Sequence, residues 1–267
     1  MKPKNLPEQH THAFAGKLAG LLYSLCSYLL FLLTAIYLIG FLSGIGVPKD
    51  INSGAGLSWP LAVIVDTLLI TLFAIQHSGM ARQPFKRWWV TFIPAPIERA
   101  TYVLSTCLVL ILIFWLWQPM PTSIWSVTSI WGHGLLMALF WLGCGVVVLS
   151  TFLISHFELL GITQALSAWH SARPDNPTFK TPLLYKLVRH PLYLGFLIVF
   201  WATPDMTDGH LLFALLNTVY ILIGAHFEEK DLVDLFGERY QRYQQNVAML
   251  VPLTKLNLTA SAGNKSE

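Results

Sequence analysis

The sequence has 267 residues, of which 54% are hydrophobic and only 12% are charged. Soluble domains carry roughly 25% charged residues, so this composition excludes an ordinary soluble protein and indicates an integral membrane protein. The net charge of +3 is small and the basic residues are dispersed among loops, which gives no argument for nucleic-acid binding. Cys26, Cys107 and Cys144 all lie inside apolar runs, so they predict neither a disulfide framework nor a metal site.

Long apolar runs follow one another along the chain. A polar segment of residues 1–16 comes first, and the run after it is too long for a signal peptide, so we expect a retained span. The expected spans cover about Leu18–Leu42, Leu57–Ile75, Tyr102–Trp117, Trp131–Ile154 and Leu211–Ala225. A sixth run, Leu192–Thr203, is short for the roughly 20 residues of a crossing. The sequence therefore predicts an all-α, polytopic bundle of five to six transmembrane helices.

Basic residues gather in alternate connections between the spans, and the other connections hold only Lys49 or none. Because positive residues are retained on the cytoplasmic side, we expect both termini in the cytoplasm and the protein in a bacterial inner membrane. Polar residues at span ends then share that side: Gln76, His77, Glu98, Arg99, His156, Glu158, Arg189, His190, His226 and Glu228. Ionisable groups near bilayer depth commonly mark function, which predicts a cytoplasm-facing pocket. The alternative is that some of them are snorkelling interface residues.

An apolar hairpin separates two polar stretches, residues 185–195 and the glutamates at 228 and 229. Pro191 suits the first turn of a helix, where its missing N–H costs nothing. Two antiparallel helices would bring the glutamates close to three residues at the start of the hairpin: Arg189, His190 and Tyr193.

We divide the chain accordingly into four segments. They are a cytoplasmic N-terminal segment (1–16), four transmembrane helices with their loops (17–182), the hairpin with a C-terminal helix (183–256) and a disordered tail (257–267). The N-terminal segment carries His10, His12 and Phe14 on the expected cytoplasmic side, where it could cover the pocket. The alternative for this segment is a mobile tail.

The C-terminal part carries a resemblance. The pattern Tyr185-x-x-x-Arg189-His190-Pro191-x-Tyr193-x-Gly195, then Glu228-Glu229-x-x-Leu232-x-x-x-Phe236-Gly237-x-x-Tyr240-x-x-Tyr243 and Val251-Pro252, resembles the isoprenylcysteine carboxyl methyltransferase superfamily. The resemblance implies that this region encloses S-adenosylmethionine in a cytoplasm-facing pocket. The implied cofactor-binding residues are Tyr185, His190, Pro191, Tyr193, Leu194, Gly195, Glu228 and Glu229.

The chemistry of that cofactor agrees with these residue types. Glu228 can pair with its amino group, Arg189 and His190 can meet its carboxylate, and the tyrosines of the stretch can pack against its nucleoside. Gly195 would let the backbone approach closely. The sequence has no glycine-rich strand–turn–helix motif, which excludes a Rossmann-type methyltransferase.

The N-terminal half resembles a narrower group. The patterns Gln76-His77-Ser78-x-Met80-Ala81-Arg82-x-x-Phe85-Lys86, Pro94-x-x-x-Glu98-Arg99-x-x-Tyr102, Trp117-Gln118-Pro119 and His156-Phe157-Glu158-Leu159-x-Gly161 are similar to those of bacterial membrane proteins that include methanethiol S-methyltransferases. They also resemble a plastid carotene cis-trans isomerase that holds haem. The prenylcysteine enzymes carry a substrate-binding arginine where this sequence has Gly224, which favours a small neutral thiol as acceptor, although Arg99 or Arg189 could substitute.

The resemblance therefore implies an S-adenosylmethionine-dependent methyltransferase that converts a small volatile thiol, methanethiol, to dimethyl sulfide. The pKa of a simple thiol lies above that of cysteine, so a base or a positive field is needed. The candidate catalytic residues are His77, Glu98, Arg99, His156 and Arg189. The expected partners are the thiol substrate and the lipid bilayer, and nucleic acid is not expected. The alternatives are a haem-binding isomerase or redox protein with histidine ligands, and a methyltransferase acting on a lipid or prenylated thiol.

Overall fold

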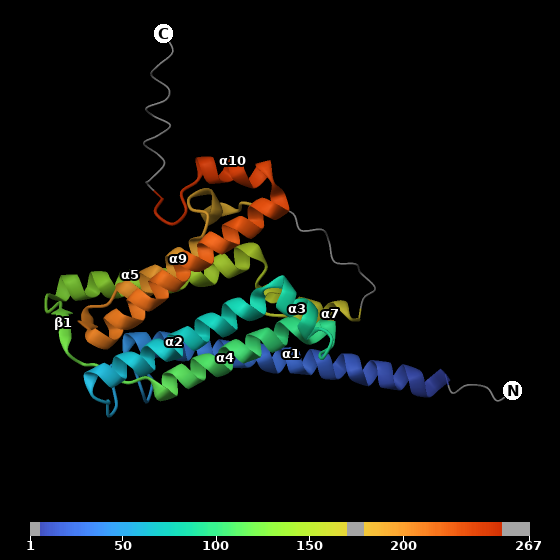
Figure 1. The fold of residues 1–267 in the computed structure, drawn as a ribbon, viewed down its shortest axis with the longest axis horizontal. Helices are drawn as coiled ribbons and strands as arrows, with labels where there is room; N and C mark the ends of the chain where they lie inside the picture. Colours follow the sequence, from blue (N-terminus) through green and yellow to red (C-terminus); the bar gives the residue numbers. More distant parts are fainter. Residues whose placement is uncertain (1–5, 170–178, 253–267) are drawn as a thin grey trace, which may run out of the picture. The chain divides into compact units, whose positions relative to one another are not determined.

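A computed structural model describes residues 6–169 and 179–252, with side chains from residue 14 onward (Figure 1). The N-terminal part contains α1 (Leu6–Ser43), α2 (Trp59–Ala81), α3 (Gln83–Trp89), the 3-10 helix η1 (Ala95–Ile97) and α4 (Glu98–Leu116). The middle contains the strand β1 (Ser123–Ser126), α5 (Ile130–Ile154), α6 (His156–Leu159) and α7 (Ile162–Ser167). The C-terminal part contains η2 (Leu183–Lys186), α8 (Pro191–Trp201), the strand β2 (Asp205–Thr207), α9 (Asp208–Phe236) and α10 (Glu238–Asn246). The predicted all-α class is confirmed.

Five helices are long and apolar enough to cross a membrane, which confirms the five long spans predicted. They are the Phe14–Ser43 part of α1, α2, α4 together with η1, α5 and α9. Many of their large apolar side chains are exposed, such as Leu33 at 65% and Ile36 at 66%, as expected where lipid surrounds a helix. The sixth apolar run forms α8, whose 11 residues are fewer than the roughly 20 of a crossing.

Two helices, α1 and α9, extend furthest beyond the apolar runs that predict them. α1 is helical from Leu6, so residues 6–16 continue the same helix as the first span. α9 begins at Asp208 and runs to Phe236, so the charged residues after the apolar run belong to the same helix. A covering role for residues 1–16 stays a prediction, and the predicted tail at 257–267 lies outside the described residues.

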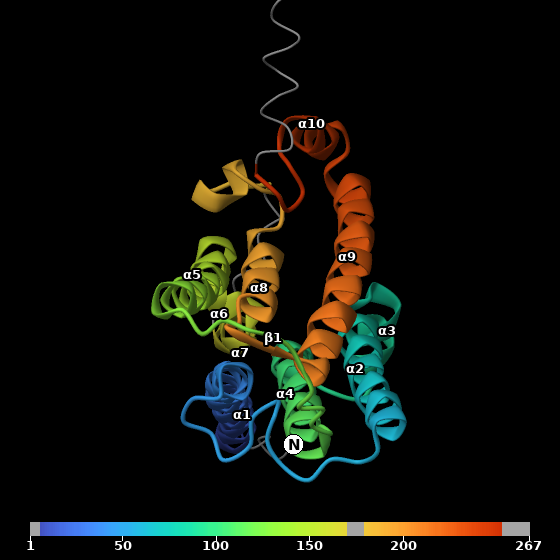
Figure 2. The same cartoon turned by 90° about the vertical axis from the view of Figure 1, so that its left-hand side faces the viewer.

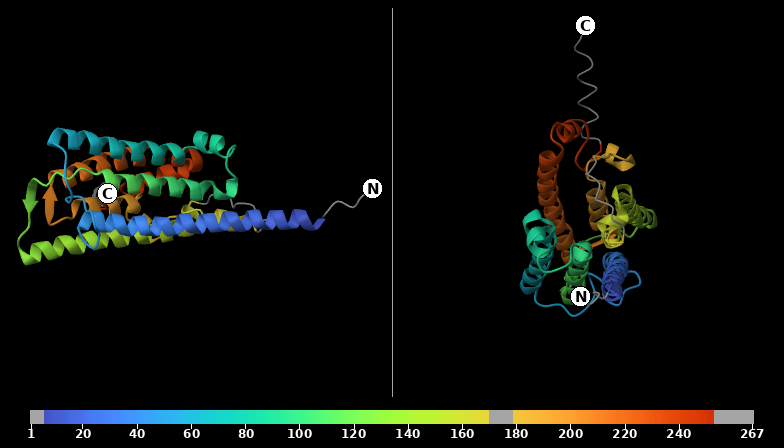
Figure 3. Two further views of the ribbon diagram at one scale, coloured as in Figure 1. Left: turned by 90° about the horizontal axis from the view of Figure 1, so that it is seen from below. Right: turned by 90° about the vertical axis from the view of Figure 1, so that its right-hand side faces the viewer.

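The chain folds into two compact units, each assembled from separate stretches of sequence. The first contains α1, residues 65–81 of α2, α3, η1, α4, α6 and α7. In it α1 packs along α4, and α7 packs against both α1 and η1 (Figure 3). Gly161 precedes α7 at a φ of +87°, and a Cβ there would lie 2.6 Å from the backbone nitrogen of Ala100. Glycine thus permits the close approach of this turn to α4.

The second unit contains the start of α2, β1, α5, η2, α8, β2, α9 and α10. α8 and α9 form the predicted hairpin, α5 packs along α8, and α10 follows α9 (Figure 2). β1 pairs with β2 in antiparallel fashion, with Ser123 opposite Thr207 and Ser126 opposite Asp205. Neither strand is predicted from the sequence. The two units interleave along the chain, whereas the segments 17–182 and 183–256 expected from the sequence are contiguous.

A pair of glycines joins α8 to α5. A Cβ on Gly195 would lie 2.8 Å from the side chain of Val147 and 3.0 Å from the carbonyl oxygen of Gly143. A Cβ on Gly143 would in turn lie 3.0 Å from the carbonyl oxygen of Gly195. Small residues allow such close contact between membrane helices, whose association depends on van der Waals packing. Gly195 therefore serves helix packing in this structure, and its approach to a cofactor stays a prediction.

We expect the substitution Gly195→Ala to destabilise the protein by about 1–3 kcal/mol, because the added methyl group overpacks α8 against α5. Thermal unfolding in detergent, followed by circular dichroism, measures this as a lower Tm. Gly134→Ala is the matched control, because Gly134 also lies in α5 and no heavy atom lies within 4 Å of its Cβ position. The control should keep or raise the Tm, since alanine favours a helix over glycine. An equal decrease in both variants would contradict the packing role.

Candidate functional site

The second unit brings together the polar residues at the start of α8 and near the end of α9. Arg189 Nε lies 2.5 Å from Glu229 Oε1, and His190 Nε2 lies 3.1 Å from the same oxygen. Tyr193, in the first turn of α8, donates a hydrogen bond from its hydroxyl to Glu228 Oε2 at 2.6 Å. The predicted proximity of these two stretches is confirmed.

The two neighbouring glutamates have different surroundings. Glu229 is 14% exposed, and its Oε2 accepts a hydrogen bond from Gln244 Nε2 at 3.0 Å. Glu228 is 46% exposed, and His190 Nδ1 lies 3.7 Å from the oxygen that Tyr193 contacts. Successive residues of an α-helix point about 100° apart, so the two carboxylates cannot share one environment. Glu229 is therefore an anchor within the unit, whereas Glu228 presents a half-exposed carboxylate.

α10 and the residues after it hold the start of α8. Arg189 Nη1 donates to the carbonyl oxygens of Gln244 at 3.1 Å and Val247 at 2.6 Å. Two backbone N–H groups pair with the same segment: Arg189 N with Ala248 O at 2.8 Å, and His190 N with Met249 O at 3.1 Å. The Arg189 side chain is only 8% exposed. Arg189 thus connects the start of α8 to α9 and to the end of α10. A side chain with these contacts positions the elements around it.

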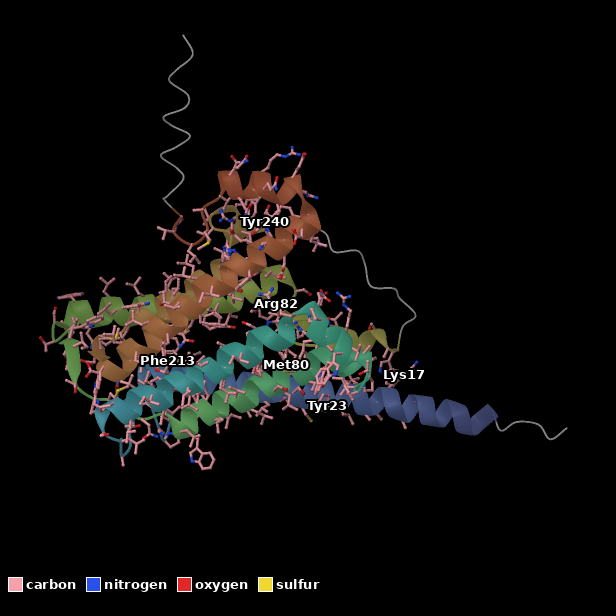
Figure 4. All side chains as sticks on the ribbon, in the orientation of Figure 1. Lys17, Tyr23, Met80, Arg82, Phe213 and Tyr240 are labelled. Atoms are coloured by element: carbon pink, nitrogen blue, oxygen red, sulfur yellow. The ribbon has the colours of Figure 1, made fainter. Side chains whose placement is uncertain are left out.

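Aromatic side chains of α10 pack against the segment before α8. The hydroxyl of Tyr243 donates to the backbone carbonyl of Tyr185, and Tyr240 is buried on the inner side of α10 (Figure 4). The ring of Phe179 contacts both tyrosines of α10, with centroids 5.8 Å and 5.3 Å away. Burial raises the pKa of Tyr185, and the charge of Glu228 raises it further. Burial likewise raises the pKa of Tyr243 to about 12, so both phenols are neutral at physiological pH.

The first unit contains a second polar cluster, formed by α2, α4 and α6. The hydroxyl of Tyr102 lies 2.9 Å from His77 Nε2, and Thr106 Oγ1 lies 3.3 Å from His77 Nδ1. Arg99 lies over the Tyr102 ring at 5.0 Å and donates from Nε to the carbonyl oxygen of Leu159 at 2.8 Å. One turn of α4 therefore links His77 on α2 to the end of α6.

His156 begins α6 in the same unit and is buried. Its Nε2 lies 3.1 Å from the hydroxyl of Tyr28 on α1, and burial lowers its pKa, so the ring is neutral at neutral pH. Glu98 begins α4 next to Arg99. Burial and the positive charge of Arg99 lower the pKa of Lys86, and the carboxylate of Glu98 acts in the opposite direction. Lys86, Glu98 and Arg99 thus lie within electrostatic reach of one another.

The structure groups the predicted site residues in two sets. The second unit contains Tyr185, Arg189, His190, Pro191, Tyr193, Leu194, Gly195, Glu228 and Glu229; the first contains His77, Glu98, Arg99 and His156. A pocket shared by both sets stays a prediction. Tyr28, Lys86, Thr106 and Gln244 are not among the predicted site residues. Tyr28 and Thr106 lie in apolar runs, where one hydroxyl is a weak signal, whereas Gln244 directly follows the last tyrosine of the C-terminal pattern.

Five helices long and apolar enough to cross a membrane, the last of which carries the carboxylates of Glu228 and Glu229, define a polytopic helical membrane protein. The methanethiol S-methyltransferase of Pseudomonas sp. strain GM41 is 71% identical over 252 residues, which cover 94% of this chain and 97% of that protein. The one from Pseudomonas deceptionensis is 60% identical over 257 residues, which cover 96% and 98%. Methanethiol S-methyltransferase 1 of Bradyrhizobium diazoefficiens is 50% identical over 236 residues, which cover 88% and 83%.

The chain belongs to the methanethiol S-methyltransferase family. No family model matches the chain. No solved structure matches it either.

We expect the half-buried phenol of Tyr243 to make the protein sensitive to alkali. Its pKa is about 12 in the folded protein and about 10 in an unfolded chain. The neutral phenol therefore contributes stability that is complete below about pH 10 and is lost as the pH rises towards 12. Between about pH 9 and pH 11, the Tm of Tyr243→Phe should fall less than that of the wild type, as measured by circular dichroism. Equal losses in the two proteins would contradict this prediction.

Proposed function

We propose that the protein methylates methanethiol with S-adenosylmethionine as the methyl donor and releases dimethyl sulfide. The observation that carries the proposal is the half-exposed Glu228 carboxylate held by Tyr193, in a chain that is 71% identical to a methanethiol S-methyltransferase over 94% of its length. We place the protein in the inner membrane with both termini in the cytoplasm, since the basic residues gather in alternate connections. The site would then face the cytoplasm.

The residues around Glu228 fit a cofactor with a cationic amino group. Tyr193 fixes one carboxylate oxygen at 2.6 Å while the side chain stays 46% exposed, so a charge-assisted hydrogen bond to an ammonium group needs little rearrangement. The ring of His190 stacks on that of Tyr193, with centroids 5.2 Å apart, and keeps the phenol in place. When bound, S-adenosylmethionine would supply an electrophilic methyl group on a sulfonium centre.

Arg189 and Glu229 would act on the cofactor through their neighbours. The guanidinium of Arg189 is bonded to Glu229 and to two backbone carbonyls, which favours a positioning role over the expected contact with the cofactor carboxylate or a catalytic role. Breaking a buried ion pair by removing one partner costs about 3–5 kcal/mol, because the remaining charge is left unpaired, so loss of either partner should disturb this region. We therefore assign binding to Glu228 and positioning to Glu229.

The first unit would act on the acceptor. The cations Lys86 and Arg99 provide a positive field that favours the thiolate. His156 is neutral and oriented by Tyr28, so it can take the proton of the thiol; His77 and Glu98 are the further candidates. S-adenosylmethionine, held by Glu228 and Tyr193, would supply the methyl group to the thiolate sulfur as the bond from the methyl carbon to the sulfonium sulfur breaks. The products are dimethyl sulfide, the demethylated cofactor and a proton on the base.

The first test is turnover by the purified protein in detergent, supplied with methanethiol and S-adenosylmethionine. Gas chromatography should detect dimethyl sulfide, and hydrogen sulfide or a larger thiol should react more slowly. Lack of turnover with every volatile thiol would refute the proposed reaction, and faster turnover of another thiol would replace the acceptor.

The role of His156 is tested in the same assay. His156→Gln should lower kcat at neutral pH by about 100-fold or more, because a general base contributes at least that much. Raising the pH should restore part of the rate, since the thiol then ionises without a base. His133→Gln is the control, because His133 is exposed at the start of α5. A loss of rate that is the same at every pH would contradict the role as a base.

The assignment of the two glutamates is tested by one isosteric change at each. Glu228→Gln should raise the Kd for S-adenosylmethionine about 10-fold or more, because a charge-assisted hydrogen bond contributes about 1.5–3 kcal/mol. Its Tm should stay near that of the wild type, since the side chain is half exposed. Glu229→Gln should instead lower the Tm, because Arg189 loses its carboxylate partner. Calorimetric titration and thermal unfolding measure the two effects, and an unchanged Kd in folded Glu228→Gln would exclude the binding role.

A further inference from the structure

Four aromatic rings pack together in and just after α3. The centroids of Phe85, Trp88, Trp89 and Phe92 lie between 5.1 and 5.7 Å from those of their neighbours. Trp88 is nevertheless 52% exposed and Phe92 is 67% exposed. An apolar patch of this kind marks a surface that contacts something other than water. We call these four rings, together with the basic residues beside them, the α3 surface: Phe85, Trp88, Trp89, Phe92, Arg82, Lys86 and Arg87.

The α3 surface lies where two membrane-spanning helices end. α2 ends at Ala81, directly before α3, and the next span begins with η1 at Ala95. Figure 3 shows α3 beside this end of α2, and Figure 4 shows Arg82 near the start of α3. A helix of about 20 residues reaches across the hydrocarbon core, so the shared end of the two spans lies at a membrane surface. Tryptophan is enriched at that depth, because its ring is both apolar and polar.

The segment that contains α3 and η1 carries only positive charges. Residues 82–97 contain three basic residues and no acidic residue. Lys86 is half-buried within reach of Arg99 and Glu98, whereas Arg87 is exposed next to Trp88. An exposed arginine beside aromatic rings at a membrane surface matches the lipid phosphate in charge and in hydrogen-bonding geometry.

We propose that the α3 surface inserts into the headgroup layer of the bilayer and selects anionic over zwitterionic phospholipids. The rings would lie at the boundary between headgroups and acyl chains, and Arg87 would pair with the phosphates. α3 connects the helix of His77 to the helix that begins with Glu98 and Arg99, so its anchoring would hold the ends of both helices at a constant depth.

The test uses the full-length protein in vesicles of phosphatidylcholine and phosphatidylglycerol, in which one of the two lipids carries bromine on its acyl chains. Bromine quenches nearby tryptophan, and the difference in fluorescence between the wild type and Trp88→Phe isolates the contribution of Trp88. We expect Trp88 to be quenched by both lipids and to prefer phosphatidylglycerol. Arg87→Gln should lower that preference about fivefold, because one basic residue near an anionic surface contributes about that much.

Arg242→Gln is the matched control, because Arg242 is an exposed arginine of α10 whose side chain is 74% accessible. It should leave the lipid preference of Trp88 unchanged, and added salt should weaken the preference in both the control and the wild type. If neither brominated lipid quenched Trp88, the α3 surface would lie outside the bilayer and the proposal would fail. Equal quenching by the two lipids at low salt would overturn the selectivity for anionic lipid.

Discussion

The carboxylate of Glu229 is the interaction on which the geometry of the second unit depends. Arg189, His190 and Gln244 all direct nitrogen atoms at it, from the start of α8 and from α10. A largely buried charge is stable only when its hydrogen-bonding positions are filled, so each of these contacts constrains the others. The start of α8, the C-terminal part of α9 and α10 are therefore held together by one side chain. Glu228, one residue earlier, is half exposed and takes no part in this contact with Arg189.

α8 illustrates how a helix too short to cross a membrane is kept in position. Its packing against α5 depends on two glycines, Gly143 and Gly195, whose carbonyl oxygens would both lie 3.0 Å from a Cβ on the other residue. Its first residue follows His190, which is held by Glu229 and by the backbone of Met249. Close packing along the helix and hydrogen bonds at its start fix Tyr193 relative to Glu228. Such preorganisation favours binding, because these side chains lose little conformational entropy when a ligand binds.

In the first unit, contacts between tyrosines and histidines provide partners for polar side chains. His77 and His156 each contact a tyrosine hydroxyl, from Tyr102 and Tyr28 respectively. Within apolar helices a polar side chain without a partner is costly, so paired tyrosines and histidines are tolerated where isolated ones would not be. Arg99 adds a cation over the ring of Tyr102. The result is a set of contacts with tyrosine hydroxyls that orients both imidazole rings.

The sequence by itself determined the membrane class, the five long spans and the proximity of residues 189–193 to Glu228 and Glu229, because hydropathy and helix length act along the chain. It could not show which glutamate is the anchor, because that depends on Gln244 and Arg189, which reach the site from separate elements. The packing role of Gly195 depends in the same way on Gly143, far away in the sequence. Side-chain direction is set by partners that only folding brings near, so these assignments were decided by the tertiary structure.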